Sequence, residues 1–289
     1  MLINLHQLKT GGKTLEGILY RNFKKELFYL TKSQKNTEKI YIGEMFNILK
    51  DQNYKKRIEK KNVITGHMLF GLHKVIKNID TKYYTVLRDP YQRAKSYFYY
   101  MMQSEEFEIT KILIKKKIDF EKFCNFCCFS KKKLKTYGFS NRAIEEIDIV
   151  LNNGQTRVIS GNLKISKKKS YILAKQNIKK HFIAVGVIEL YEKSIAILAS
   201  KIKLKIPIYI NKVNTSNSYN LNILNEKKIK QKFNRHNSYD LKLHKYYSLK
   251  IEKEINKRPL YYYFILQINK INSYLQFLLR PLIKKIVFK

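Results

Sequence analysis

The first thirty residues place a short apolar segment, a glycine turn and an amphipathic segment in direct succession. Residues 2–8 are apolar enough for a buried parallel strand, and Gly11 and Gly12 follow as a turn. Residues 14–30 then carry leucine, isoleucine and phenylalanine at helical spacing. A strand, a tight turn and a helix in this order form the first part of a β–α–β unit, which restricts the chain to folds built on a parallel sheet.

Strands and helices continue to alternate along the chain. Residues 62–65, 83–87 and 182–187 predict three further strands. After the second of these, Asp89 suits a helix cap and Pro90 suits the first helical turn. Helices are predicted for residues 91–102, 168–180, 190–203 and 239–257. Residues 104–150 are also predicted to be helical, with Ser140 capping a helix that holds Glu145 and Glu146. This alternation predicts an α/β fold with a mostly parallel sheet flanked by helices.

Length and composition indicate how the chain is divided. With 289 residues and 44% hydrophobic content, the chain is able to bury one large core. We expect one domain over residues 1–217, because no repeat or linker interrupts it, followed by a basic helical C-terminal extension over residues 218–289. Residues 261–289 mix apolar side chains with lysine and arginine, so this tail either packs on the domain or lies on a membrane surface.

The net charge of +37 is extreme for a chain of this length. It is compatible with a nucleic-acid binder, a protein on an anionic membrane or an enzyme for polyanionic ligands. Codon bias in an AT-rich genome explains part of the charge equally well, since the chain is also rich in Asn, Ile and Tyr and has no Trp. The lysine runs at residues 115–117, 131–133 and 167–169 are typical of solvated helix faces.

Cysteine usage and the N-terminal sequence exclude several other classes. Cys124, Cys127 and Cys128 are too few and too close for a disulfide framework, and no second pair completes a zinc site, so we expect buried thiols. The N-terminus lacks a charged segment followed by an apolar one, and no run of about 18 apolar residues occurs. We therefore expect neither a signal peptide nor a membrane span, and a cytoplasmic location, at most peripheral on the inner face of the membrane.

The glycine turn is the first candidate site. Its backbone N–H groups would open a helix, where the helix dipole favours an anion, and lysine and hydroxyl side chains add donors for phosphate oxygens. The residues concerned are Lys9, Thr10, Gly11, Gly12, Lys13 and Thr14. A Walker A motif would need a glycine at position 7, where the chain has Gln7, so a nucleoside-triphosphate site is the weaker interpretation.

Two further motifs follow predicted strands. His67 comes directly after the strand at residues 62–65, where an imidazole is placed to act as a general base or is simply structural. Arg88 ends the strand at residues 83–87, and Ser96 lies two turns into the next helix. The arginine fork and the serine hydroxyl suit a phosphate, although Arg88 and Asp89 also suit a surface ion pair.

Taken in order, these motifs resemble the carbohydrate sulfotransferases, most closely the bacterial proteins related to heparan sulfate 2-O-sulfotransferase. The matching segments are Lys-Thr-Gly-Gly at 9–12, Gly-His-x-x-Phe-Gly-Leu-His at 66–73, Leu-Arg-Asp-Pro-x-x-Arg-x-x-Ser at 87–96, Gln-Thr-Arg at 155–157, the helix and strand at 174–189 and an Asn-containing loop at 211–215. The resemblance spans residues 2–217. Leu8 and Lys13 depart from it, because the family has Pro and Ser or Thr at these positions.

The resemblance implies a P-loop-like sheet and a transferase that takes a sulfuryl group from 3′-phosphoadenosine 5′-phosphosulfate without a metal. Residues 9–14 would hold the 5′-phosphosulfate, Arg88 and Ser96 the 3′-phosphate, and His67 would be the catalytic base. Lys9 would stabilise the leaving phosphate. His73 and Arg157 are candidates for binding the acceptor, with structural roles as the alternative.

We expect a polysaccharide or glycolipid as acceptor, possible contact with an anionic membrane surface, and no nucleic-acid partner. Two other functions remain open. A nucleoside-triphosphate-dependent kinase would use the same Gly12-Lys13-Thr14 segment. A basic nucleic-acid-binding protein would explain the charge directly, although the chain has no recognisable nucleic-acid module.

Overall fold

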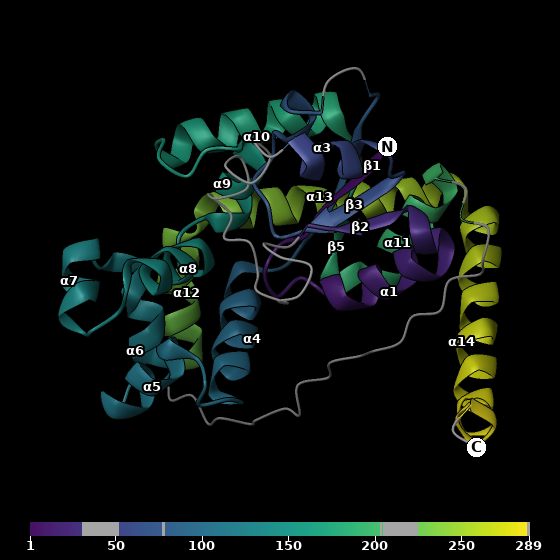
Figure 1. Cartoon of the computed structure of the whole chain (residues 1–289). Helices are drawn as coiled ribbons and strands as arrows, with labels where there is room; N and C mark the ends of the chain where they lie inside the picture. The colour runs from purple at the N-terminus through teal and green to yellow at the C-terminus, as the bar shows by residue number, and fades with distance from the viewer. Residues whose placement is uncertain (31–51, 77–78, 203, 205–224, 288–289) are drawn as a thin grey trace.

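The computed structural model describes residues 1–30, 52–76, 79–202, 204 and 225–287, with the backbone alone for residue 54 and residues 276–287. Its centre is a sheet of five strands, all parallel, in the order β2-β3-β1-β4-β5 (Figure 1). The strands are β1 (Leu2–Leu5), β2 (Leu27–Tyr29), β3 (Val63–Gly66), β4 (Lys82–Leu87) and β5 (Phe182–Val187). The α/β class and the parallel sheet predicted from the sequence are confirmed.

Strand β1 lies at the centre of the sheet and pairs with β3 and β4. Leu2 is in register with Val63 on one side and with Lys82 on the other. Because all of the strands run in the same direction, their carboxyl ends meet at one edge. The loops that follow β1, β3 and β4 therefore leave the sheet side by side.

Helices bury both faces of the sheet (Figure 1). On one face, α1 (Gly12–Phe23) and α11 (Tyr191–Ile202) cover side chains such as Tyr84 and Val86. The other face, with Tyr83 and Leu87, is covered by α3 (Gln52–Glu59), α9 (Gly154–Ser160), α10 (Lys167–His181) and α13 (Ser238–Lys257). Successive residues of a strand thus enter opposite cores, as a doubly covered parallel sheet requires.

A separate helical layer packs beside the sheet around its own core. It consists of α4 (Pro90–Met102), α5 (Glu108–Lys115), α6 (Phe120–Asn125), α7 (Lys131–Thr136), α8 (Asn141–Leu151) and α12 (Glu226–His236). Its core is rich in aromatic rings and includes Cys124 and Cys127, which confirms that these two thiols are buried; Cys128 is exposed.

The helix predicted for residues 14–30 was wrong in extent, and the helical region at residues 104–150 is divided. The helix predicted for residues 14–30 ends at Phe23, and residues 27–29 form strand β2, because Leu27 and Phe28 pair with β3 and enter the core. Residues 104–150, which were predicted to be helical, contain four α-helices, and the last of them is capped by Ser140 as predicted. Capping side chains start three of them, since Asp119, Ser130 and Ser140 each accept a hydrogen bond from the backbone N–H three residues later. The predicted strand at residues 2–8 also ends early, at Leu5.

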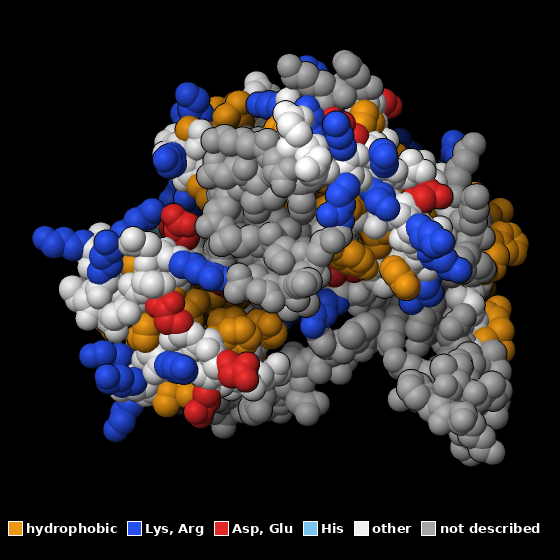
Figure 2. All heavy atoms as spheres, in the orientation of Figure 1, with side chains coloured by type: hydrophobic (Ala, Val, Ile, Leu, Met, Phe, Trp, Pro, Cys, Tyr) orange, Lys and Arg blue, Asp and Glu red, His pale blue; other side chains and the backbone are white. Residues whose placement is uncertain are grey.

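Several other expectations are confirmed. The Asp89 carboxylate caps α4 by accepting from the Gln92 N–H at 3.0 Å, and Pro90 lies in the first helical turn. The lysines at residues 115–117 and 131–133 are exposed, and Figure 2 shows lysine and arginine side chains spread over the visible face rather than gathered in one patch. Residues 211–215 and the boundary at 217–218 lie outside the described residues.

The C-terminal region is part of the core. Phe233 of α12 enters the core of the helical layer, and Leu243 and Ile251 of α13 enter the core above the sheet. The two helix N-termini of α9 and α13 cap each other. The Asp240 carboxylate accepts from the N–H groups of Gln155 and Thr156 at 3.1 and 2.8 Å, and the Asn153 side-chain oxygen accepts from the N–H groups of Tyr239 and Asp240 at 3.0 and 3.1 Å.

Asp240 also lies 3.5 Å from the guanidinium of Arg93, and both side chains are fully buried. Removing one partner of a buried ion pair leaves the other charge without compensation. We predict that Asp240→Ala lowers the free energy of unfolding by about 3–5 kcal/mol, measured by denaturant titration. Asp80→Ala, at a carboxylate that is 87% exposed, is the control and should cost under about 0.5 kcal/mol. Equal losses in the two variants would contradict this role of Asp240.

Candidate functional site

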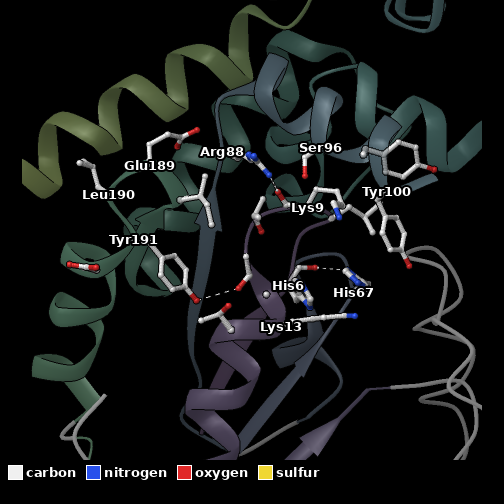
Figure 3. Close-up of a pocket in the computed structure, with 18 of the residues that line it drawn as sticks. His6, Lys9, Lys13, His67, Arg88, Ser96, Tyr100, Glu189, Leu190 and Tyr191 are labelled. Atoms are coloured by element: carbon white, nitrogen blue, oxygen red, sulfur yellow. Dashed lines mark hydrogen bonds between the residues drawn. The ribbon is translucent and has the colours of Figure 1, made fainter. Parts of the chain in front are cut away.

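A cavity of about 610 Å³ opens at the carboxyl edge of the sheet (Figure 3). Its walls come from the β1–α1 loop, the end of β3, the start of α4 and the turn between β5 and α11. His67, Arg88 and Ser96 line it, as do residues 9–14. The structure therefore brings together the glycine turn, the imidazole and the guanidinium that the sequence placed after three separate strands.

The glycine turn combines a left-handed backbone at Gly11 with little space for side chains at either glycine. Gly11 has a φ of +78°, and a Cβ there would overlap Ile188. A Cβ at Gly12 would overlap the ring of His6. The Tyr191 hydroxyl donates to the Gly11 carbonyl at 3.2 Å, and the buried Thr10 hydroxyl donates to the Gln7 carbonyl at 3.0 Å. The turn is thus fixed before any ligand binds.

The N-terminus of α1 begins at this turn. Gly12 is the first helical residue, and Lys13 and Thr14 follow on the cavity wall, with Lys13 exposed. The first N–H groups of a helix have no acceptor within the helix and carry the positive end of its dipole. This end of the cavity is therefore suited to an anion.

Lys9 and Arg88 lie together in the cavity. Lys9 has a φ of 62°, and its carbonyl accepts a hydrogen bond from Nη1 of Arg88 at 3.0 Å. The Lys9 ammonium stacks over the ring of Tyr100, 4.1 Å from its centroid. Figure 3 shows Ser96 next to these groups. Two cationic side chains and a hydroxyl therefore meet at one part of the wall.

The side chain of Gln155 forms two hydrogen bonds with the backbone of Arg88. The Gln155 side chain accepts from the Arg88 N–H and donates to the Arg88 carbonyl, both at 2.8 Å. Burial lowers the pKa of Arg88, and the carboxylates of Glu189 and Asp89 oppose this shift. Gln155 thus fixes the backbone of Arg88, and the hydrogen bond from Nη1 to the Lys9 carbonyl positions its guanidinium.

His67 is oriented by His6. Nδ1 of His67 lies 3.0 Å from the His6 carbonyl, and the two rings stack with centroids 4.2 Å apart. A carbonyl only accepts, so Nδ1 carries the proton and the lone pair is on Nε2. His6 is in turn held by Glu16, whose carboxylate lies 2.9 Å from its Nδ1. This tautomer is the one that a general base needs.

The fourth wall of the cavity consists of residues that were not predicted as site residues from the sequence. Glu189, Leu190 and Tyr191, in the turn after β5, and Lys193 in α11 all line it. Hydrogen bonds to Glu189 from His244 at 2.8 Å and from the Asp89 N–H at 2.9 Å outweigh its burial and lower its pKa. The strand at residues 182–187 had been predicted, so the rule that ligands bind beyond strand carboxyl ends would have identified this turn.

Two predicted acceptor-binding residues lie elsewhere. His73 packs against Phe70 and His181, and its Nδ1 lies 3.0 Å from the Tyr83 hydroxyl. Arg157 forms an ion pair with Asp148 at 2.8 Å and donates to the Leu163 carbonyl at 2.6 Å. Neither residue lines the cavity, so the structure assigns both of them contacts in the packing of the fold.

One group of possible metal ligands lies away from the cavity. The thiols of Cys127 and Cys128 and the imidazole of His236 have ligand atoms within 4.8 Å of one another, although the sequence spacing had indicated no such site. Nζ of Lys167 lies 3.1 Å from Nε2 of His236, so a cationic side chain already contacts this imidazole. The signal was not visible in the sequence because His236 comes from a helix more than 100 residues away.

No model of a known protein family matches the chain, and no curated protein sequence matches it. The resemblance to sulfotransferases therefore depends on the motif residues alone. The structure adds that residues from three of these motifs line one cavity.

The packing of His73 has a consequence for stability. Burial, together with the positive charges of His181, Lys74 and Lys180, lowers its pKa from 6.5 to about 4. The folded state therefore disfavours the protonated imidazole, and unfolding takes up a proton between these two pH values. The contribution of His73 to the free energy of unfolding is therefore fully present above pH 6.5 and decreases as the pH falls towards 4.

We predict that His73→Asn, which keeps a hydrogen-bonding side chain towards Tyr83, has a flatter dependence of Tm on pH than the unchanged protein between pH 7 and 4.5. Thermal unfolding at a series of pH values measures this. Parallel curves for the two proteins would show that His73 titrates normally in the folded state.

Proposed function

We propose that this chain is a sulfotransferase that moves a sulfuryl group from 3′-phosphoadenosine 5′-phosphosulfate to a carbohydrate hydroxyl. The observation that carries the proposal is the single cavity that joins the α1 N-terminus, Lys9, Arg88 and His67. A volume of about 610 Å³ is in the range of cofactor and ligand pockets. In this proposal the β1–α1 loop is a P-loop-like phosphate cradle.

The donor would use the two cationic parts of the cavity. Its 5′-phosphosulfate would lie at the N-terminus of α1, where N–H groups, Lys13 and Thr14 offer donors. Its 3′-phosphate would lie against Arg88 and Ser96. Figure 3 shows these two parts on either side of Lys9, which suits a ligand with an anion at each end.

His67 would start the chemistry as the general base. Its Nε2 takes the proton from the acceptor hydroxyl, and the hydroxyl oxygen then forms a bond to sulfur as the bond from sulfur to the bridging phosphate oxygen breaks. Adenosine 3′,5′-bisphosphate leaves, and Lys9 and the loop N–H groups stabilise the negative charge that develops on its 5′-phosphate. As in phosphoryl transfer, positioning and charge stabilisation supply most of the rate.

The acceptor that we propose is an acidic polysaccharide or a glycolipid, because the basic surface would attract either of them. We place the enzyme in the cytoplasm or on the inner face of the membrane. The segment Gly12-Lys13-Thr14 favours a kinase instead. Binding of adenosine 3′,5′-bisphosphate or of magnesium–ATP distinguishes these two functions.

We predict that adenosine 3′,5′-bisphosphate raises the Tm without magnesium, because a ligand that binds only the native state stabilises it by about 2.7 kcal/mol at 100 times its Kd. Arg88→Ala and Arg88→Lys should both reduce the shift, the latter because lysine lacks the bidentate fork. Arg142→Ala, at an exposed arginine outside the cavity, is the matched control. Stabilisation by magnesium–ATP but not by the bisphosphate would favour the kinase.

We also predict that His67→Gln and Lys9→Met each lower turnover by about 10² or more, since one loses the base and the other a charge that stabilises the leaving group. The assay incubates the protein with labelled donor and a panel of cell-surface glycans and detects the products by mass. His181→Gln, outside the cavity, is the control. If either variant turns over as fast as the unchanged protein, the role assigned to that residue is wrong.

A further inference from the structure

The C-terminal helix α14 (Pro259–Val287) presents apolar side chains on two opposite faces. One face packs on the body: Tyr262 is buried, Ile265 and Leu266 contact the core above the sheet, and the helix touches α11 and α13. The other face consists of eight large apolar side chains that are 45–73% exposed. They are Leu260, Tyr261, Tyr263, Phe264, Ile268, Ile271, Tyr274 and Leu275.

These eight residues form one continuous stripe, which we call the outer face of α14. At about 100° per residue, they fall within an arc of roughly 160° opposite the packed residues. Single exposed apolar side chains are normal on a protein surface, but a continuous patch marks an interaction site. Figure 2 shows apolar side chains gathered along the edge of the molecule where α14 lies.

The sequence around the outer face carries only positive charge. Residues 255–289 contain seven lysines and arginines and no aspartate or glutamate. Of these, Lys257, Arg258 and Lys270 are described and exposed. The partner is therefore expected to be anionic. A second copy of this chain fits poorly, because each copy has a net charge of +37 and would bring cations against cations.

The composition of the outer face suits the boundary of a lipid bilayer. Tyrosine is typical of the headgroup region, where its ring is buried and its hydroxyl stays wet. Phe, Leu and Ile supply apolar area for the acyl chains, and lysine side chains reach back towards anionic headgroups. Within the residues that the structure describes, no helix has the length and apolar content needed to cross a bilayer.

We propose that α14 anchors the protein to the surface of a membrane rich in anionic phospholipids. The helix lies parallel to the bilayer, with its outer face buried at the boundary of headgroups and acyl chains and its inner face still packed on α11 and α13. The proposal depends on the outer face and the charge alone and does not require sulfotransferase activity.

The first test is cosedimentation of the full chain with vesicles. We expect binding to vesicles of phosphatidylcholine and phosphatidylglycerol, weakening as salt is added, and little binding to phosphatidylcholine alone. Replacing Phe264, Ile268 and Ile271 by serine should weaken the binding by more than about tenfold, because the apolar contribution is lost. The matched control replaces Met102, Ile114 and Ile172, which are 41–47% exposed on other helices, and should bind normally.

A second test uses the absence of tryptophan from the chain. Tyr263 on the outer face and Tyr20 on α1 are each 56% exposed. Tyr263→Trp should show a blue shift of its fluorescence with anionic vesicles, and Tyr20→Trp should show none. This measurement does not depend on removing apolar side chains, so it holds even if the serine variant is unstable.

Three results would overturn the proposal. Equal binding by the serine variant and its control would mean that the outer face is not the contact. No shift at position 263 would mean that this face stays in water. Self-association in sedimentation velocity that the serine variant abolishes, without vesicle binding, would make the outer face an interface between copies.

Discussion

The parallel pairing of β3, β1 and β4 is the constraint on which the site depends. Because β1 is in the middle and all three strands run in one direction, the loop after β1, His67 after β3 and Arg88 after β4 must emerge side by side. Two hydrogen bonds then hold the loop after β1: Arg88, which follows β4, donates to the Lys9 carbonyl, and Tyr191, which follows β5, donates to the Gly11 carbonyl. The backbone of the glycine turn is thereby fixed from two sides, which is the preorganisation that an anion site requires.

A second layer of contacts connects the cavity to the C-terminal region. Asp240 of α13 holds the N-terminus of α9, and Gln155 in the first turn of α9 clamps the backbone of Arg88. Residues 225–257 are therefore not an appendage to the site. They belong to the chain of contacts that fixes the backbone of a cavity residue, although none of the sequence motifs lies there.

Local patterns in the sequence predicted most of the sheet, because buried strands are short apolar runs with clear ends. They failed where long-range contacts decide the structure. Residues 27–29 have helical neighbours but become β2 because β3 offers them partners. His67 and Arg88 were found because they follow predicted strands, whereas Glu189 and Tyr191 were overlooked in the same position after β5. His73 and Arg157 matched motifs but face Tyr83 and Asp148, and no sequence pattern reveals such a partner.

The positions of the charged residues distinguish two roles that composition alone does not distinguish. One is the binding of an anion in the cavity, and the other is the attraction of the whole protein to an extended anionic partner. Among the described residues, Lys9, Lys13, Arg88 and Lys193 line the cavity, but Glu146, Glu189 and Glu192 line it as well, so the charges that these residues bring to the cavity largely cancel. Other described lysines lie on the outside, as at residues 115–117 and 131–133. Charge spread over a surface does not select a small anion, but it attracts extended ones. A strong surface potential beside an uncharged, exposed apolar helix face is what a protein needs to approach an anionic bilayer and then remain on it.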